Sequence, residues 1–238
     1  MGEALAYALV AALGNIVGGL AVTRNAERGL RVIELCVAFG AGFMLAVALV
    51  DVIPEAFARS GLLAGPLVLA GYLGVHLAQH TLTPHFHFGE ETHQVHAVAG
   101  MSALLGLLVH TLFDGVAIAS GFLVRPALGL LLFLAILIHK LPEGVTIASL
   151  MLAGGRSRGQ AVGAAALLGV ATVLGVVLTN DLGVLARHGL AISGGVTLYV
   201  AASNLVPEFQ AKRSWLVAAS FFGGAGAVFL VRLLPGSP

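Results

Sequence analysis

The chain has 238 residues, of which 58% are hydrophobic and only 10% are charged, and its formal net charge at pH 7 is +1. Soluble domains carry about 25% charged residues, so this composition argues against a water-soluble domain and indicates an integral membrane protein within a lipid bilayer. The small net charge, without a basic stripe, argues against a nucleic-acid partner.

Eight apolar segments are long enough to cross a bilayer as helices, because a span needs about 20 mostly apolar residues. They are residues 3–22, 32–57, 62–80, 98–124, 127–152, 160–178, 190–209 and 215–234. The start of the chain lacks the basic segment of a secretory signal, so the first segment is predicted to be retained. The predicted fold is a single all-α transmembrane domain over residues 1–238.

The connections between spans differ in their content of Lys and Arg, which are enriched in cytoplasmic loops. One side carries Arg24, Arg28, Arg31, Arg156, Arg158, Lys212 and Arg213, and the other carries Arg59, Arg125, Arg187 and Arg232. The first side is therefore predicted to be cytoplasmic, which places both termini outside the inner (plasma) membrane.

The second span ends with DVIPEAF at residues 51–57, which resembles NLVPEFQ at residues 204–210 near the end of the seventh span. These spans are five apart in order, so the two copies run in opposite directions. The pattern predicts that spans 1–3 and 6–8 form an inverted repeat around spans 4 and 5, as in many secondary transporters. Chance similarity between short apolar words is the alternative.

The third span ends with His76 and His80, and residues 81–96 after it contain four further histidines and two glutamates but no Lys or Arg. The predicted topology places this segment in the cytoplasm. His-rich tracts favour weak metal binding, whereas a polar linker with incidental histidines is an equal alternative. His76 and His80 have a simple alternative as a solvated pair at a helix end.

The fourth and fifth spans each carry a histidine followed four residues later by an acid, namely His110 with Asp114 and His139 with Glu143. Residues four apart share one face of a helix, so each span presents two ligands in one direction. Near the middle of a span, an ionised carboxylate is costly unless it is paired, hydrated or bound to a cation. Imidazole with carboxylate favours zinc and neighbouring divalent ions over copper(I) or calcium. These four residues are the predicted metal site.

A buried polar network in which Lys140 neutralises Asp114 or Glu143 is the competing interpretation of the same residues. Pro142 removes a backbone donor inside the fifth span, so a kink is expected beside the site.

Other polar residues of the spans are candidates for a pathway or gates. The topology places Asp51 and Glu55 toward the outer face, and Asn204 and Glu208 toward the cytoplasm, with His76 and His80 beyond them. For the two Pro-Glu steps, an ordinary helix end is the alternative.

The function favoured by these residues is transport, with Zn²⁺ or a similar divalent ion as the substrate and no catalytic cofactor. An intramembrane zinc-dependent hydrolase is a second candidate, but the sequence has neither a His-Glu-x-x-His helix nor a Gly-x-Ser-x-Gly motif. A passive metal channel or a metal sensor is a third.

The motifs HTLFDG at residues 110–115 and HKLPEG at 139–144 resemble those of the ZIP (Zrt/Irt-like) divalent metal transporters of prokaryotic type. The resemblance implies inward transport of zinc and related ions, an eight-span 3+2+3 inverted-repeat fold, a homodimer and elevator-like alternating access. It also implies that the two His and two acidic residues carry the ion, and that spans 2 and 7 guard access to it.

The sequence departs from the pattern of relatives that hold two metal ions side by side. Those relatives have Asn, Asp and Glu where this chain has Thr111, Lys140 and Thr172. A fixed ammonium repels a second divalent cation, so a single-metal centre is predicted. Ligand type alone does not rank zinc, iron, manganese, cobalt and cadmium.

Overall fold

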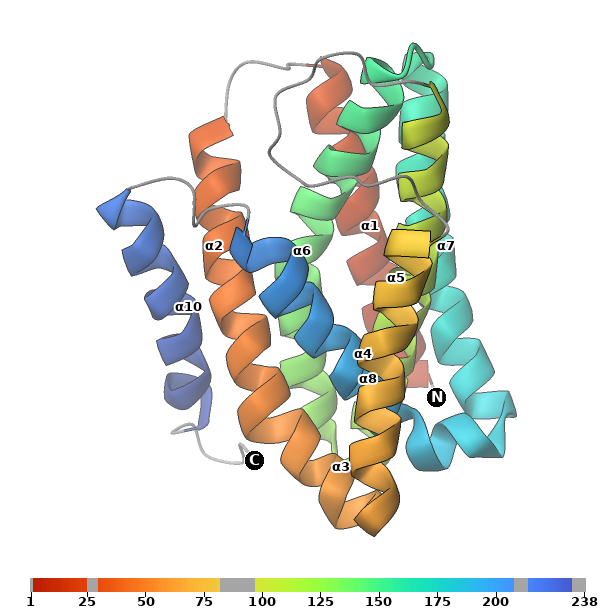
Figure 1. The fold of residues 1–238 in the computed structure, drawn as a ribbon, viewed down its shortest axis with the longest axis vertical. Helices are drawn as coiled ribbons and strands as arrows, with labels where there is room; N and C mark the ends of the chain where they lie inside the picture. The colour runs from red at the N-terminus through yellow and green to blue at the C-terminus, as the bar shows by residue number, and fades with distance from the viewer. Residues whose placement is uncertain (1, 25–29, 82–96, 208–213, 233–238) are drawn as a thin grey trace.

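The computed structural model describes residues 2–24, 30–81, 97–207 and 214–232, and these ranges are almost entirely helical, with no β-strand among them (Figure 1). The elements are α1 (Gly2–Arg24), α2 (Leu30–Val47), η1 (Ala48–Val52), α3 (Ile53–Ser60), η2 (Gly61–Leu63), α4 (Ala64–Thr81), α5 (Ala97–Val124), α6 (Pro126–Ala153), α7 (Arg158–Asp181), α8 (Gly183–Tyr199), η3 (Val200–Leu205) and α10 (Trp215–Arg232). The prediction of an all-helical fold is confirmed for the described residues.

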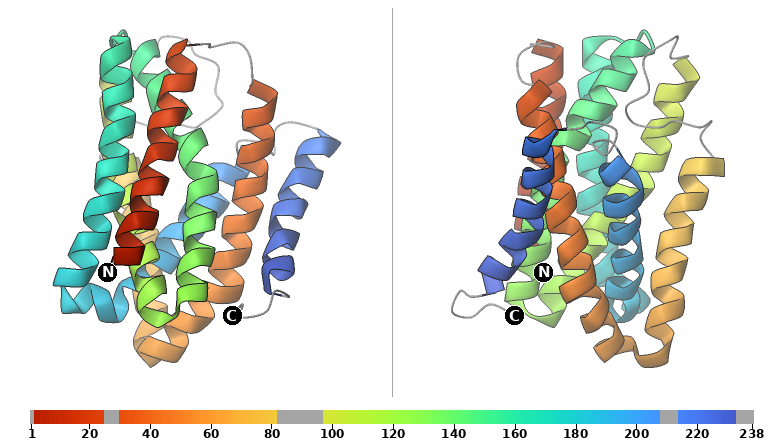
Figure 2. Two further views of the ribbon diagram at one scale, coloured as in Figure 1. Left: turned by 180° about the vertical axis from the view of Figure 1, so that it is seen from behind. Right: turned by 60° about the vertical axis from the view of Figure 1, so that its left-hand side comes forward.

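The helical stretch from α2 to α4 reverses its direction near Gly61. This residue follows α3 and has a φ of 54°, a positive value that glycine adopts readily because it has no Cβ. Figure 1 shows α2 running toward the lower end of the bundle, α3 at that end and α4 returning. The turns before α6 and α8 lie at the same end, as Figure 2 also shows from behind.

Two short π-helical segments interrupt the long helices, and each lies just before a proline. In η1, the N–H of Ile53 donates to the carbonyl of Ala48, and Pro54 follows. In η3, the N–H of Val206 donates to the carbonyl of Ala201, and Pro207 is the next residue. A proline has no N–H for the regular helical bond, which favours such local widening of the helix.

The distribution of apolar side chains is that of a protein surrounded by lipid. Six helical stretches among the described residues are long and apolar enough to cross a membrane, and the apolar part of α10 is shorter. Large apolar side chains face outward, with Leu62 at 96%, Trp215 at 87% and Phe222 at 70% exposed. Charged groups such as Lys140 are buried instead. The chain is therefore a multi-pass membrane protein.

The helices form two sets of close neighbours. In one set, α6 packs against α1, α5 and α7, while α7 also packs against α1 and α5. In the other, α2 packs against α10 and α4 packs against α8. Contacts of α5 with α8 and of α6 with α2 join the two sets.

The closest helix crossings are made by glycines that face carbonyl groups of the neighbouring helix, which is how helices associate closely in lipid. At each of these positions an added Cβ would collide with the facing carbonyl oxygen. The pairs are Gly18 with Leu141 and Gly144 with Asn15 for α1 and α6, Gly175 with Leu112 and Gly115 with Thr172 for α5 and α7, Gly42 with Phe221 and Gly224 with Phe39 for α2 and α10, and Gly195 with Val68 and Gly71 with Ile192 for α4 and α8.

Candidate metal centre

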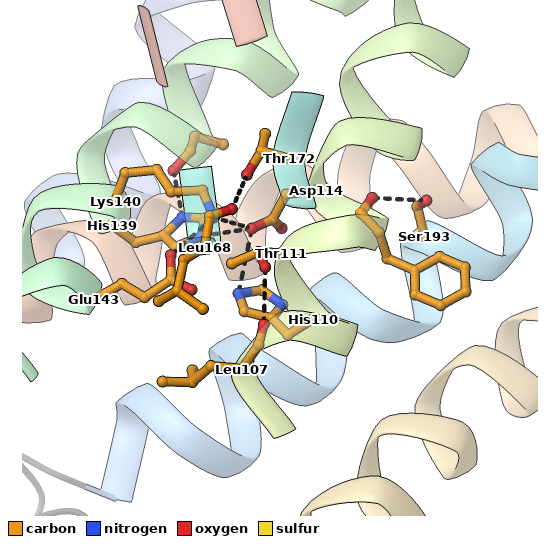
Figure 3. Close-up of polar contacts among 12 residues, drawn as sticks. Leu107, His110, Thr111, Asp114, His139, Lys140, Glu143, Leu168, Thr172 and Ser193 are labelled. Carbon is orange, nitrogen blue, oxygen red and sulfur yellow. Dashed lines mark hydrogen bonds and ion pairs between the residues drawn. The ribbon is translucent and has the colours of Figure 1, made fainter. Parts of the chain in front are cut away.

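Four groups that can bind a metal ion come together between α5 and α6. His110, Asp114, His139 and Glu143 each offer one ligand atom, and these atoms lie within 4.8 Å of one another. All four residues are buried. Each helix contributes one pair spaced by a single turn, and the two pairs face each other across the helix interface (Figure 3). The spacing in the sequence therefore corresponds to one cluster in the fold.

The Asp114 carboxylate is the common partner in this cluster. Its Oδ2 lies 3.3 Å from Nε2 of His110 and 3.3 Å from Nε2 of His139. Lys140 Nζ lies 2.7 Å from the same oxygen. One carboxylate oxygen of α5 is thus shared by both imidazoles and by an ammonium group of α6.

The orientation of His139 is set by its own helix. Its Nδ1 lies 3.0 Å from the carbonyl oxygen of Ala135, which can only accept a hydrogen bond, so Nδ1 carries the proton. Nε2 faces a second acceptor, Asp114 Oδ2 at 3.3 Å, so this nitrogen either donates to the carboxylate or, in the neutral tautomer with the proton on Nδ1, offers its lone pair to an ion bound between them. A backbone carbonyl that fixes the tautomer in this way is the usual support for a metal-binding histidine.

Lys140 connects both acids. Besides its bond to Asp114, its Nζ donates to Glu143 Oε2 at 2.8 Å, and its side chain is fully buried. Lys140 therefore pairs with both acids, as in the buried polar network that is the alternative to a metal site. These ion pairs lie in the same cluster as the four potential metal ligands. They supply the compensating charge that a carboxylate needs in this environment.

Two polar atoms of the cluster lack a hydrogen-bond partner among the described residues, namely Nδ1 of His110 and Oε1 of Glu143. Both residues, together with His139, line a cavity of about 40 Å³, which is large enough for water. Asp114 is not among its lining residues. Buried atoms of this kind are expected to find a partner, and a cation or water in the cavity would provide one to the glutamate.

Asn15 of α1, which the sequence patterns did not predict to lie at the site, also belongs to this region. Its side chain is fully buried, and the amide nitrogen, in the orientation that satisfies its neighbours, donates to the carbonyl of Lys140 at 2.6 Å and to Glu143 Oε2 at 3.3 Å. The only signal in the sequence is a lone amide within an Ala- and Gly-rich span, where a polar group needs a partner.

Thr111 and Thr172, where the resemblance predicts a departure from two-metal relatives, are also fully buried. Their hydroxyl groups donate to carbonyls of their own helices, Thr111 to Leu107 at 2.9 Å and Thr172 to Leu168 at 3.3 Å. Among the described residues, neither hydroxyl bonds to the cluster.

Of the predicted pathway residues, Asn204 lines the same cavity as the cluster. Asp51 is buried in η1, and Glu55 of α3 pairs with Arg125 at 3.3 Å. His76 is exposed, and its ring lies 5.8 Å from that of Tyr199. None of these last three predicted residues lines the cavity.

Some predictions fall on parts of the chain that the structure does not describe. Glu208 lies outside the described residues, as do the histidines and glutamates of the predicted cytoplasmic segment 81–96. For His80, the structure describes only the backbone.

A comparison with protein families adds an independent finding. The model described as ZIP zinc transporter matches residues 76–232, which is more than half of the chain and contains all four residues of the cluster. No curated protein matches the chain.

Proposed function

We propose, from the premise that this chain belongs to the ZIP zinc transporter family, that it carries Zn²⁺ through the centre formed by His110, Asp114, His139 and Glu143. Divalent metal ions are the substrates of the family, so the ion is cargo here and not a resident cofactor. Iron, manganese, cobalt and cadmium ions are further candidate substrates, because ligand type alone does not separate them.

The observation that carries this proposal is the convergence of the four ligand atoms within 4.8 Å inside the helix bundle. Ligands of tetrahedral zinc lie at about 2.0–2.2 Å from the ion and therefore about 3.5 Å from one another. Small side-chain movements are enough to reach that geometry. Mixed nitrogen and oxygen ligands also suit a site that must release its ion.

The centre is proposed to hold one ion at a time. Lys140 places a positive charge against both carboxylates, at 2.7 Å from Asp114 and 2.8 Å from Glu143. Thr111 and Thr172 direct their hydroxyls to their own helices. A second divalent ion would meet the repulsion of the ammonium without gaining additional charged ligands.

The proposed fold is a 3+2+3 arrangement of eight spans in a single domain over residues 1–238, with an inverted repeat. The glycine crossings support this fold. Each residue that makes the α2–α10 crossing has a counterpart in the α4–α8 crossing, and the two always differ by 153 in residue number. The corresponding residues are Gly42 and Gly195, Phe39 and Ile192, Val68 and Phe221, and Gly71 and Gly224. Pro54 and Pro207, each after a π-helical segment, differ by the same 153 positions.

A repeat of this kind favours alternating access, with an elevator-like motion of one helix set against the other. The cavity continues from the cluster to Val37, Leu107 and Thr146, toward the start of α5 and the end of α6. The Glu55–Arg125 ion pair lies at the opposite end, where α6 begins. We take Glu55 and Asp51 as parts of an outer gate, and Asn204 as part of the exit.

The proposed orientation places the cavity on the cytoplasmic side of an inner (plasma) membrane, with both termini outside and inward transport of the ion. The exit would continue toward Glu208, His76, His80 and the segment 81–96. A homodimer is proposed from the family alone.

The decisive experiment is uptake of Zn²⁺ by the purified full chain in sealed proteoliposomes, with competing metals and over a range of pH. We expect saturable uptake that is lost in His110→Ala and Glu143→Ala. Thr179→Val is a matched control, because among the described residues this buried hydroxyl donates to the carbonyl of Gly175 in its own helix, at 2.8 Å, and not to the cluster. Flux that does not saturate would favour a passive channel, and no flux for any metal would contradict the proposal.

A further inference from the structure

We propose that Asn15 of α1 is a positioning residue of the metal centre, which holds the Glu143 carboxylate by one oxygen so that the other is presented to the transported ion. The inference rests on the proposed function, because it takes Glu143 as a metal ligand. It assigns a role at the centre to α1, a helix that contributes none of the four candidate ligands.

The Asn15 amide is oriented by the two oxygen atoms that it faces. One end of the Asn15 side chain faces two oxygens of α6, the Lys140 carbonyl at 2.6 Å and Glu143 Oε2 at 3.3 Å. A carbonyl oxygen and an ionised carboxylate oxygen can only accept hydrogen bonds, so the group that faces them is the NH₂ of the amide. Asn15 therefore donates to both, and its side chain has no exposed surface through which water could replace it.

Close packing of α1 against α6 holds the Asn15 amide in this position. The backbones of α1 and α6 meet at this level, since a Cβ on Gly144 would collide with the Asn15 carbonyl and a Cβ on Gly18 with the Leu141 carbonyl. This close approach brings a short side chain of α1 within reach of the acid on α6. The position of the donor is thus set by two helices and not by a mobile side chain.

The Glu143 carboxylate is held by one of its two oxygens. Its Oε2 receives Lys140 Nζ at 2.8 Å and the Asn15 amide at 3.3 Å, whereas its Oε1 has no hydrogen-bond partner among the described residues. Glu143 also lines the cavity. A glutamate side chain has several rotatable bonds, so two donors on one oxygen restrict the direction of the other.

The corresponding place on the other side of the centre lacks this contact. The Thr172 carbonyl faces Gly115 as the Asn15 carbonyl faces Gly144. The Thr172 hydroxyl, however, donates to Leu168 of its own helix. The positioning contact is therefore a feature of the α1–α6 side alone, where the longer of the two acids lies.

The test measures Co²⁺ binding by the purified full chain, because the d–d absorption of Co²⁺ reports its ligand geometry as well as its affinity. Asn15→Leu, close to Asn in size, removes both hydrogen bonds, and Thr179→Val serves as the matched control in a neighbouring helix. Loss of a group that orients a metal ligand costs about 10- to 100-fold in affinity. We expect a loss of that size and an altered absorption spectrum for Asn15→Leu, and neither change for Thr179→Val.

A double-mutant cycle separates positioning from general structure. In the Glu143→Ala background there is no carboxylate to orient, so Asn15→Leu should cause little further loss. An equal loss in both backgrounds would overturn the inference. Asn15→Asp, which keeps the shape of the side chain, covers the case in which Asn15→Leu does not fold; it turns a donor into an acceptor that faces Glu143 and should also weaken binding.

The outcomes also distinguish this inference from the function on which it rests. If the unmodified chain binds Co²⁺, Glu143→Ala weakens that binding and Asn15→Leu does not, only the role of Asn15 is wrong. If Glu143→Ala has no effect on binding or uptake, the proposed centre itself is wrong.

Discussion

Lys140 and Asp114 are joined across the interface between α5 and α6, with Nζ 2.7 Å from Oδ2 and neither side chain more than 1% exposed. The same ammonium lies 2.8 Å from Glu143 Oε2. A metal ion bound at the proposed centre would therefore compete with a fixed positive charge for both carboxylates.

The first prediction concerns stoichiometry. We expect one Zn²⁺ per chain at the centre, because a second divalent ion beside Lys140 would be opposed by several kcal/mol at an effective dielectric near 20. Metal analysis should use a variant without residues 82–96, so that the histidines of that segment do not contribute. Two central ions that are both lost in His110→Ala would contradict the prediction.

The second prediction concerns the strength of binding. Lys140→Met removes the competing charge while keeping the length of the side chain, so we expect Zn²⁺ to bind about tenfold more tightly or better. Release should become slower, and maximal uptake should fall. A competition titration gives the affinity, and size-exclusion chromatography checks folding, because removal of one partner from a buried ion pair is destabilising. Weaker binding by folded Lys140→Met would refute this account.

The third prediction concerns the glycine crossings, with two glycines of α10 as a matched pair. A Cβ at Gly224 would collide with the carbonyl of Phe39, whereas one at Gly226 meets nothing within 4 Å. Overpacking costs about 1–3 kcal/mol, so Gly224→Ala should lower the midpoint of thermal unfolding and Gly226→Ala should not. The same contrast is expected for Gly71→Ala and Gly74→Ala in α4. Equal midpoints within each pair would show that these crossings do not limit packing.

The fourth prediction concerns the ion pair of Glu55 with Arg125. If it closes the outer side, Arg125→Gln should increase the labelling of Val52→Cys by an external, membrane-impermeant maleimide in a Cys36→Ser background. Val52 is fully buried in the structure. Arg187→Gln is the control, because this exposed arginine has no recorded ion pair among the described residues. Similar labelling in both variants would show that the Glu55–Arg125 pair is not part of the outer gate.

The fifth prediction concerns the segment that follows α4. Deletion of residues 82–96 should leave saturated Zn²⁺ uptake intact, because the four ligands of the centre lie on α5 and α6. The measurement is uptake by the deleted chain in proteoliposomes, with retained metal binding as the check on folding. Complete loss of uptake by the folded variant would mean that the segment belongs to the transport machinery.

The convergence of the four side chains was predictable because its signal is local. His110 and Asp114 are one helical turn apart, and so are His139 and Glu143, which fixes the face of each helix without knowledge of the fold. Their depth in apolar segments marked them further. The structure brings the two faces together, as this spacing predicted.

The contacts around the four side chains depend on helix packing and were therefore harder to predict from the sequence. Asn15 is separated from Glu143 by more than a hundred residues, and only the crossing at Gly144 brings them into contact. From the sequence, either Asp114 or Glu143 could be predicted as the partner of Lys140. The contact of Lys140 with both acids at once depends on the approach of α5 to α6.

The boundaries of the elements show a similar limit. The prediction of a seventh span over residues 190–209 missed the start of α8 at Gly183, because Arg187 and His188 interrupt the apolar pattern while the backbone remains helical. The prolines at 54 and 207 were visible in the sequence, but the π-helical widening before each depends on how the freed backbone groups are satisfied in the fold.

The Lys140 ammonium also gives the centre an electrical polarity that reverses on loading. Counted by formal charge, Asp114, Glu143 and Lys140 together carry one negative charge, and a bound divalent ion changes this to one positive charge. An inside-negative voltage then pulls the loaded centre inward and pushes the empty centre outward, with about 2.3 kcal/mol for each elementary charge that crosses 100 mV. In the proposed cycle, an inside-negative membrane potential would therefore favour both strokes.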